Sequence, residues 1–186
     1  MEQEFIYQAK QGDTAAYESL VRQHQEAVFR LACLLLGDAG DAEDAAQETF
    51  IRAFRSLSTF DSTRPFRPWL LSITANVARN RRRSIGRYFA ALQRLVIITP
   101  RETGNAESES IQQWEAKTLW KAVQTLNVID QEVIYLRYFM ELSVSETAEI
   151  LKVEQGTVKS RLSRALSRLR EVIRQDFPLL YEGRQA

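Results

Sequence analysis

The stretch VEQGTVKSRLSRALSRLRE, Val153 to Glu171, decides how the C-terminal part of this chain folds. Its apolar residues recur every three or four positions, which predicts a helix with one apolar face; they are Val158, Leu162, Ala165, Leu166 and Leu169. Five cations surround that face, and no acid lies between Glu154 and Glu171. Because solvated helix faces usually mix acids with bases, we expect the apolar face to pack on a domain and the cations to face a polyanion.

A second helix is predicted immediately before this stretch, ending at Leu151. Ser143 and Glu146 stand three residues apart in SVSETAEIL, which is the spacing of a capping box. A turn near Val153 then separates the two helices. This order is that of a helix-turn-helix motif, whose second helix lies in the DNA major groove. A helical hairpin in a bundle is the alternative that spacing leaves open, and the run of cations favours the DNA-binding interpretation.

The remaining segments also have helical periodicity, over residues 13–36, 41–57, 69–84, 114–126 and 130–142. We expect Asp13 and Asp41 to cap the first two of these helices, and His24 to lie on a polar surface. The chain has only seven Gly and four Pro, which argues against an all-β architecture with its many tight turns. The predicted fold is therefore all-α, with two small helical domains joined by a linker.

Two segments interrupt the helical pattern. STFDSTRPFRP, residues 58–68, is predicted to be an exposed loop, because Pro65 and Pro68 each lack a backbone donor and disfavour helix in the preceding residue. PRETGNAESES, residues 100–110, has the composition of a linker. We therefore predict domains over residues 1–95 and 113–186, with a linker over 96–112. The apolar stretch 89–99 forms either an extra helix or a packing surface.

Charge is distributed very unevenly, although the net charge is only +1. Residues 1–51 contain ten acids and three bases, whereas residues 52–100 contain ten arginines and a single acid, Asp61. An acidic segment followed by an arginine-rich one indicates two different partners, one basic and one polyanionic.

Several classes of function are disfavoured. Cys33 is the only cysteine and His24 the only histidine, so a disulfide framework and a multi-cysteine zinc site are excluded. The sequence has no metal-ligand cluster, phosphate-binding loop or nucleophile–base pair, so we expect no enzyme, catalytic residue, metal, cofactor or small-molecule substrate. The N-terminus has no signal pattern and the apolar runs are short, which predicts a cytoplasmic protein without membrane insertion.

Two blocks resemble a known family. LNVIDQEVIYLRYFMELSVSETAEILKVEQGTVKSRLSRALSRLRE resembles region four of the extracytoplasmic-function (ECF) sigma factors of bacterial RNA polymerase. DAEDAAQETFIRAFRSLSTFDSTRPFRPWLLSITANVARNRRR resembles their region two, and the resemblance spans roughly Gly12 to Glu171. It implies a subunit that binds core RNA polymerase, recognises two elements of promoter DNA and helps to melt the first. It also implies an anti-sigma factor as a partner.

The resemblance assigns residues to three roles. The polymerase-binding face would comprise Asp44, Gln47, Glu48, Arg52 and Arg55. The minus-ten element would be bound by Phe60, Asp61, Ser62, Thr63, Arg64, Phe66, Asn76, Arg79, Asn80, Arg82 and Arg83. The minus-thirty-five element would be read by Thr157, Lys159, Ser160, Arg161 and Arg164. Exposed aromatic rings can stack on unpaired bases, so we expect Phe60 to do so, whereas Phe66 belongs either to this surface or to the core.

A free-standing helix-turn-helix regulator is the alternative function. It would bind duplex operators with the C-terminal domain and use residues 1–95 to sense or dimerise. It explains the last helix but leaves the acidic helix and the arginine-rich segment without a role. Two residues depart from the family pattern, Glu154 at the start of the last helix and Ser163 within it, and both bear on base preference at the minus-thirty-five element.

Overall fold

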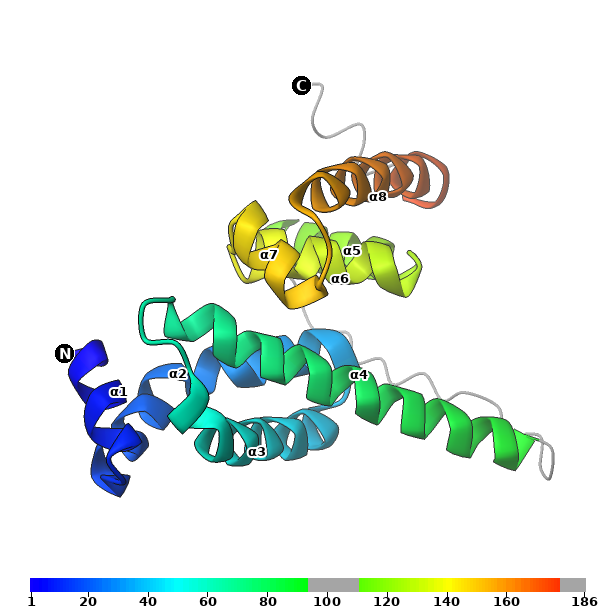
Figure 1. Cartoon of the computed structure of the whole chain (residues 1–186). Coiled ribbons are helices and arrows are strands. Elements are labelled where there is room, and N and C mark those ends of the chain that lie inside the picture. The colour runs from blue at the N-terminus through cyan, green and yellow to red at the C-terminus, as the bar shows by residue number, and fades with distance from the viewer. Residues whose placement is uncertain (94–110, 178–186) are drawn as a thin grey trace.

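The computed structural model describes the backbone of residues 1–93 and 111–177, and the side chains of residues 1–83 and 117–177. These residues form eight α-helices and two short helical segments, and the described part of the chain contains no β-strand. The predicted all-α fold class is confirmed. Figure 1 shows α1 to α4 as one group, with α7 lying above α4 and α8 at the far side of the second group.

Four helices make up the N-terminal group: α1 (Glu2–Lys10), α2 (Thr14–Leu36), α3 (Ala39–Ser56) and α4 (Phe66–Gln93). A 3-10 turn, η1 (Leu57–Thr59), follows α3. Helix α2 packs against each of the other three, and α3 also packs against α4. The apolar faces predicted from helical spacing therefore meet in one core, which includes the fully buried Leu20, Leu31 and Leu70.

The C-terminal group comprises α5 (Ile111–Gln124), α6 (Val128–Ile134), η2 (Tyr135–Phe139), α7 (Val144–Leu151) and α8 (Gln155–Asp176). The segment η2 is a single π-helical turn that continues α6. Helix α8 packs against α5, α6 and α7. Its buried residues Val158, Ala165 and Leu169 belong to the apolar face predicted from the sequence.

Side chains close to the helix ends cap them as predicted, except at the start of α3. Asp13 caps α2 by accepting backbone N–H groups, and Ser143 and Glu146 form the expected capping box of α7. The predicted cap at Asp41 is wrong, because Asp38 caps α3 and its Oδ1 accepts the Asp41 N–H at 2.8 Å. Gly37 ends α2 in the left-handed conformation (φ 76°), which lets the next helix begin almost at once.

Helix α4 departs from the sequence prediction at both ends. It begins at Phe66, so Pro68 lies in its first turn and not in a loop. Proline is tolerated there because N–H groups of the first turn have no acceptor within the helix. At the other end α4 continues to Gln93, past the point where the apolar pattern fades. Residues 89–93 of the unassigned apolar stretch are thus helical, and 94–99 lie outside the described residues.

His24 is buried, contrary to the expectation of a surface position. The residue is 5% exposed, its Nε2 lies 2.7 Å from Glu2 Oε1, and its ring centroid lies 5.3 Å from that of Phe66. The carboxylate from α1 satisfies the ring nitrogen, so burial leaves no unpaired polar atom at this contact. Periodicity within α2 alone could not reveal a partner contributed by another helix.

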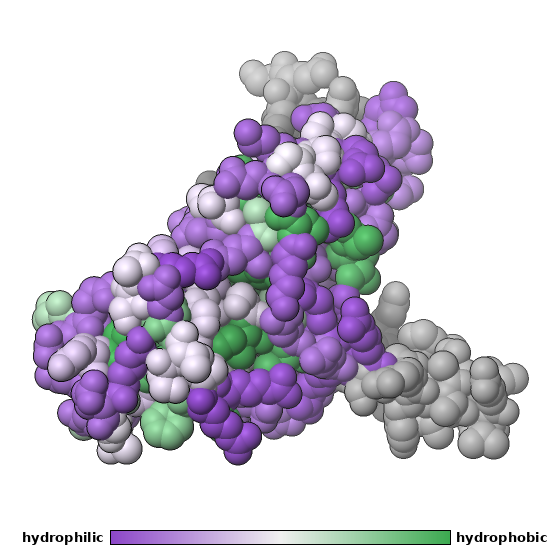
Figure 2. All heavy atoms as spheres, viewed as in Figure 1, coloured by the Kyte–Doolittle hydropathy of each residue, from purple (hydrophilic) through white to green (hydrophobic). Residues whose placement is uncertain are grey.

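The two groups of helices are in contact. Helix α4 packs against α7, and the apolar cluster of buried residues is continuous from α2 and α4 into the C-terminal helices. Arg67 also donates from Nη2 to the carbonyl oxygen of Met140 at 2.9 Å. On the side of the molecule seen in Figure 2, hydrophilic residues cover most of the surface of both groups. None of the described helices is both long and apolar enough to span a membrane.

Candidate functional site

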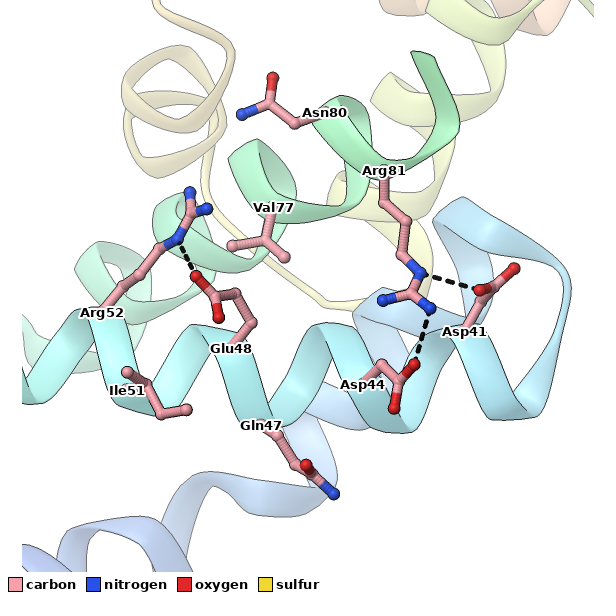
Figure 3. Close-up of a pocket in the computed structure, with 9 residues that line it drawn as sticks. All are labelled: Asp41, Asp44, Gln47, Glu48, Ile51, Arg52, Val77, Asn80 and Arg81. Atoms are coloured by element: carbon pink, nitrogen blue, oxygen red, sulfur yellow. Dashed lines mark hydrogen bonds and ion pairs between the residues drawn. The ribbon is translucent and has the colours of Figure 1, made fainter. Parts of the chain in front are cut away.

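A groove of about 690 Å³ lies between α3 and α4. We call it the α3–α4 groove; its lining comprises Asp41, Asp44, Gln47, Glu48, Ile51 and Arg52 from α3, and Val77, Asn80 and Arg81 from α4. Figure 3 shows Val77 and Arg81 extending from α4 toward α3, whereas Gln47 points away from α4. The groove therefore carries three carboxylates of α3 and two arginines, with an apolar floor at Val77.

Arg81 ties the two helices together at one end of the groove. Its Nε donates to Asp41 Oδ1 at 2.8 Å, and its Nη2 donates to Asp44 Oδ2 at 2.7 Å (Figure 3). The hydrogen bond to Asp41, and then that to Asp44, raise the pKa of the Arg81 guanidinium. The sequence prediction did not include Arg81; its partners lie 40 and 37 residues earlier in the chain.

The residues predicted to contact the polymerase lie together. Asp44, Gln47, Glu48 and Arg52 line the groove, while Arg55 is exposed one turn further along α3 and outside the lining. Glu48 and Arg52 form an i,i+4 ion pair of 2.6 Å. The same side of the molecule offers apolar area as well, because Ile51 and Phe54 are 47% and 46% exposed.

The loop between η1 and α4 has an ordered, exposed tip. Asp61 Oδ1 accepts the Thr63 hydroxyl at 2.7 Å and the Thr63 N–H at 3.0 Å, which closes an Asx turn. The Thr63 hydroxyl contributes most to lowering the pKa of Asp61, followed by the Thr63 N–H. Residues 61–65 are all exposed, so the predicted minus-ten residues Asp61, Ser62, Thr63 and Arg64 are accessible.

The expected exposure of Phe60 requires correction, and Phe66, which the sequence left open, belongs to the core. Phe60 and Phe66 are only 4% and 2% exposed, and their ring centroids lie 5.5 Å apart. Trp69 packs against both rings, at 4.6 and 5.3 Å between centroids. The aromatic side chains at either end of the loop thus anchor it to the core, because burying them removes much more apolar area than the small polar tip could offer.

One predicted DNA-binding residue of α4, Arg79, lies at the contact with the C-terminal helices. Arg79 Nε donates to Glu132 Oε1 at 2.7 Å, and Arg79 Nη2 donates to the Ile150 carbonyl at 3.0 Å. Arg79 Nη1 also donates to Asn76 Oδ1 at 2.9 Å. At the loop, Arg64 forms a second ion pair between the groups, with Glu149. In this structure the donors of Arg79 are therefore engaged within the protein.

The other predicted residues of α4 differ in exposure. Asn80 and Arg83 are exposed, and Arg82 is half-buried. Arg82 lies near the C-terminal group, since its charge lowers the pKa of Tyr135 while burial, the larger effect, raises that pKa to about 12. The predicted polar stripe of α4 is thus divided between solvent and the contact with the other helices.

Helix α8 presents a continuous polar face. Lys159, Ser160 and Arg164 are exposed, and Thr157 and Arg161 are half-buried near the same end of the helix. Arg164 Nε donates to the Ser160 carbonyl at 3.2 Å, which holds the guanidinium along the helix surface. Glu154 occupies the N-cap position without a capping hydrogen bond, and it is exposed.

One cation of α8 has a structural partner. Arg168 Nη1 donates to Asp130 Oδ2 at 2.5 Å, and the Asp130 side chain is only 4% exposed. The expectation that the helix cations face a polyanion is corrected for Arg168, which ties α8 to α6. Because the two residues are 38 positions apart, helical periodicity could not indicate the pair.

Comparison with known proteins agrees with this arrangement. The family model described as Sigma-70 region 2 matches residues 20–88, and that described as Sigma-70, region 4 matches residues 122–171. The chain is 32% identical over 177 residues to ECF RNA polymerase sigma factor SigW of Bacillus subtilis, covering 91% of this chain and 95% of SigW. This chain belongs to the ECF RNA polymerase sigma factors. The predicted family is thereby confirmed.

Two solved structures of sigma factors support the assignment of this chain to the family. CnrH in complex with the cytosolic domain of CnrY is 25% identical with a TM-score of 0.69, covering 94% of this chain and 98% of CnrH. RpoE of Bartonella quintana, in complex with the anti-sigma factor NepR, is 26% identical with a TM-score of 0.68, covering 86% and 98%. The chain is a transcription initiation factor, and its region 2 and region 4 domains serve promoter recognition.

Proposed function

We propose that this sigma factor binds core RNA polymerase through the α3–α4 groove, binds the minus-ten element with the loop and α4, and binds the minus-thirty-five element with α8. The observation that carries the proposal is the groove, where carboxylates of α3 surround an apolar floor. Because Arg52 and Arg81 already pair with these carboxylates, such a surface fits a partner that offers charged side chains of both signs together with apolar ones, since complementary charges suppress wrong partners and steer association.

The N-terminal domain would extend over residues 1–95 and would carry both the groove and the loop. The loop tip from Asp61 to Arg64 is exposed and anchored at both ends, so it can receive a base that has left the duplex. In this proposal Phe60 and Phe66 shape the loop and do not stack on DNA. Capture of unpaired bases shifts the equilibrium toward melted DNA without any catalytic step.

The contact between the domains has a consequence for DNA binding. Arg79 can reach promoter bases only after α4 separates from the C-terminal helices, because it is paired with Glu132 and with the Ile150 carbonyl. The same guanidinium also holds the Asn76 side chain. We call this arrangement, in which α4 contacts the C-terminal helices, the closed state, and the arrangement with separated domains the open state. Binding to polymerase would favour the open arrangement if polymerase contacts the two domains at separate positions.

The C-terminal domain would extend over residues 113–186, following a linker over 96–112. Its α7 and α8 form the helix-turn-helix, and the exposed Lys159, Ser160 and Arg164 lie in the half of α8 that inserts most deeply into a major groove. Thr157 and Arg161 flank them on the same side. We also propose a cytoplasmic location and an anti-sigma factor that covers these surfaces, as the relatives' complexes suggest.

A reconstituted transcription assay tests the proposal. Core RNA polymerase mixed with the sigma factor should initiate at a promoter selected from a random library, and Glu48→Lys should abolish both association and initiation. Glu26→Lys, a matched reversal at an exposed position of α2, should leave both unchanged. Tight binding to a duplex operator without polymerase, together with no association with core enzyme, would instead support a free-standing regulator.

A further inference from the structure

We propose that α1 braces the minus-ten loop and that Lys10, the last residue of α1, is a positioning residue for that loop. Helix α1 precedes residues 20–88, which match the family model, so that match assigns it no role. The inference rests on the proposed function of the loop. It adds a residue 50 positions away in sequence from the loop that it holds.

Lys10 makes three contacts with the loop. Its Nζ donates to the Phe60 carbonyl oxygen at 2.5 Å and to Ser62 Oγ at 3.1 Å. The same nitrogen lies 5.9 Å from the centroid of the Phe60 ring, within the range of a cation–π contact. One ammonium group thus binds the backbone, the ring and the tip of the loop, and charge-assisted hydrogen bonds of this kind are the stronger ones.

Helix α1 is itself held rigidly, which a brace requires. Ile6 is fully buried and Ala9 is 5% exposed, so the apolar side of α1 is packed in the core. At its other end, Glu2 pairs with the buried His24, whose ring contacts Phe66 at the end of the loop. Helix α1 therefore reaches both ends of the loop, directly through Lys10 and indirectly through His24.

Bracing matters because the loop tip has little apolar area of its own to hold it. Residues 61–65 are exposed, and the tip is otherwise fixed by the Asx turn at Asp61, by the Arg64 N–H, which donates to the Asp61 carbonyl oxygen at 3.0 Å, and by the ion pair between Arg64 and Glu149. That ion pair must break when the domains separate. Lys10 would then keep the loop in its binding conformation, so that DNA does not have to order it.

Amide order parameters of the full chain test the brace without any DNA. In the wild type, residues 61–64 should be nearly as rigid as the helices, with order parameters of about 0.8, and in Lys10→Met they should fall to roughly 0.6 or below. Lys10→Arg should keep the loop as rigid as in the wild type. Lys121→Met, at an exposed lysine of α5, should leave the order parameters of residues 61–64 unchanged. Unchanged order in Lys10→Met, with an unchanged thermal midpoint, would overturn the inference.

Binding of a single-stranded oligonucleotide, selected from a random pool with the wild-type protein, tests the functional consequence. Lys10→Met should weaken affinity about tenfold, roughly the effect of one charge-assisted hydrogen bond. The slope of log affinity against log salt should stay the same, because Lys10 does not contact phosphate. A slope reduced by about 0.7 would reveal a direct phosphate contact and overturn the positioning role.

These two measurements separate the inference from the proposed function. A loop that loosens in Lys10→Met supports the brace even if no oligonucleotide is selected, an outcome that would refute minus-ten binding alone. Selective DNA binding that is indifferent to Lys10→Met, with the loop still rigid, would refute the brace and leave the proposed function intact.

Discussion

Replacing Glu132 with Gln should open the sigma factor. The Glu132 and Arg79 side chains are 11% and 21% exposed, and the bond between them measures 2.7 Å. Hydrogen bonds to charged groups contribute about 1.5–3 kcal/mol, and a neutral amide keeps about 1 kcal/mol of that. The Glu132 carboxylate also regains hydration when the domains separate, which offsets part of the difference. We therefore expect Glu132→Gln to destabilise the closed state relative to the open state by about 1 kcal/mol, which is roughly a fivefold shift toward the open state.

The second ion pair between the domains provides an internal comparison. Arg64 and Glu149 have side chains that are 51% and 38% exposed, so water already screens their attraction. Exposed pairs of this kind contribute about 0–1 kcal/mol. Glu149→Gln should therefore shift the equilibrium less than Glu132→Gln, and Glu26→Gln on α2 should not shift it at all.

Single-molecule energy transfer can measure these shifts directly. Dyes on Gln3→Cys in α1 and Ser167→Cys in α8 report the separation of the domains, in a Cys33→Ala background that avoids labelling the native thiol. Glu132→Gln should increase the low-transfer population about fivefold. It should also tighten binding of the selected oligonucleotide, because more molecules expose Arg79. A distribution identical to that of the wild type, or a larger effect from Glu149→Gln, would refute this reasoning.

Three further predictions concern the C-terminal domain and the phenols of Tyr17 and Tyr135. Replacing Arg161 and Arg164 together with Ala should weaken binding to duplex minus-thirty-five DNA and reduce the salt slope by about 1 for each lost phosphate contact; core-polymerase affinity should stay the same, and a fall there would contradict the assignment of the domain. Arg168→Met should lower the free energy of unfolding by about 1–3 kcal/mol, because it leaves the Asp130 carboxylate buried without its cation, whereas the exposed Arg170→Met should change it by less than about 0.5 kcal/mol in a denaturant titration. Burial raises the pKa of Tyr17 and of Tyr135 to about 12, so part of the tyrosine absorbance change in an alkaline titration should appear only well above pH ~10. Since the unfolded chain ionises these phenols near pH 10, stability should fall as the pH rises from about 10 toward 12, and an absorbance change that is complete near pH ~10 would argue against their burial.

Local features of the sequence predicted the helices well. Asp13 and the pair Ser143–Glu146 satisfy backbone groups within three residues of themselves, so their roles can be recognised in any sequence window. The apolar face of α8 follows from helical geometry alone. Asp41 was misassigned because Asp38 offers the same chemistry three residues earlier, and only the backbone path after Gly37 selects between them.

The roles of aromatic and charged side chains were harder to predict. Phe60 was expected to be exposed because it lies in a polar, proline-containing segment, and Phe66 was left open between core and DNA contact; both rings are buried against Trp69. A sequence gives the composition of a loop but not the surface on which it folds back. His24 was misplaced for the same reason, since its partner belongs to a different helix.

The sequence by itself determined the all-α class, the helix-turn-helix and the family, because each depends on spacings within a few turns or on a continuous motif. Only the tertiary structure decided which charges are paired: Lys10 with the loop, Arg81 with Asp41 and Asp44, and Arg79 with Glu132. Ion pairs act over a few ångströms of space, and these partners lie 37–53 residues apart along the chain, so packing of the helices must come first.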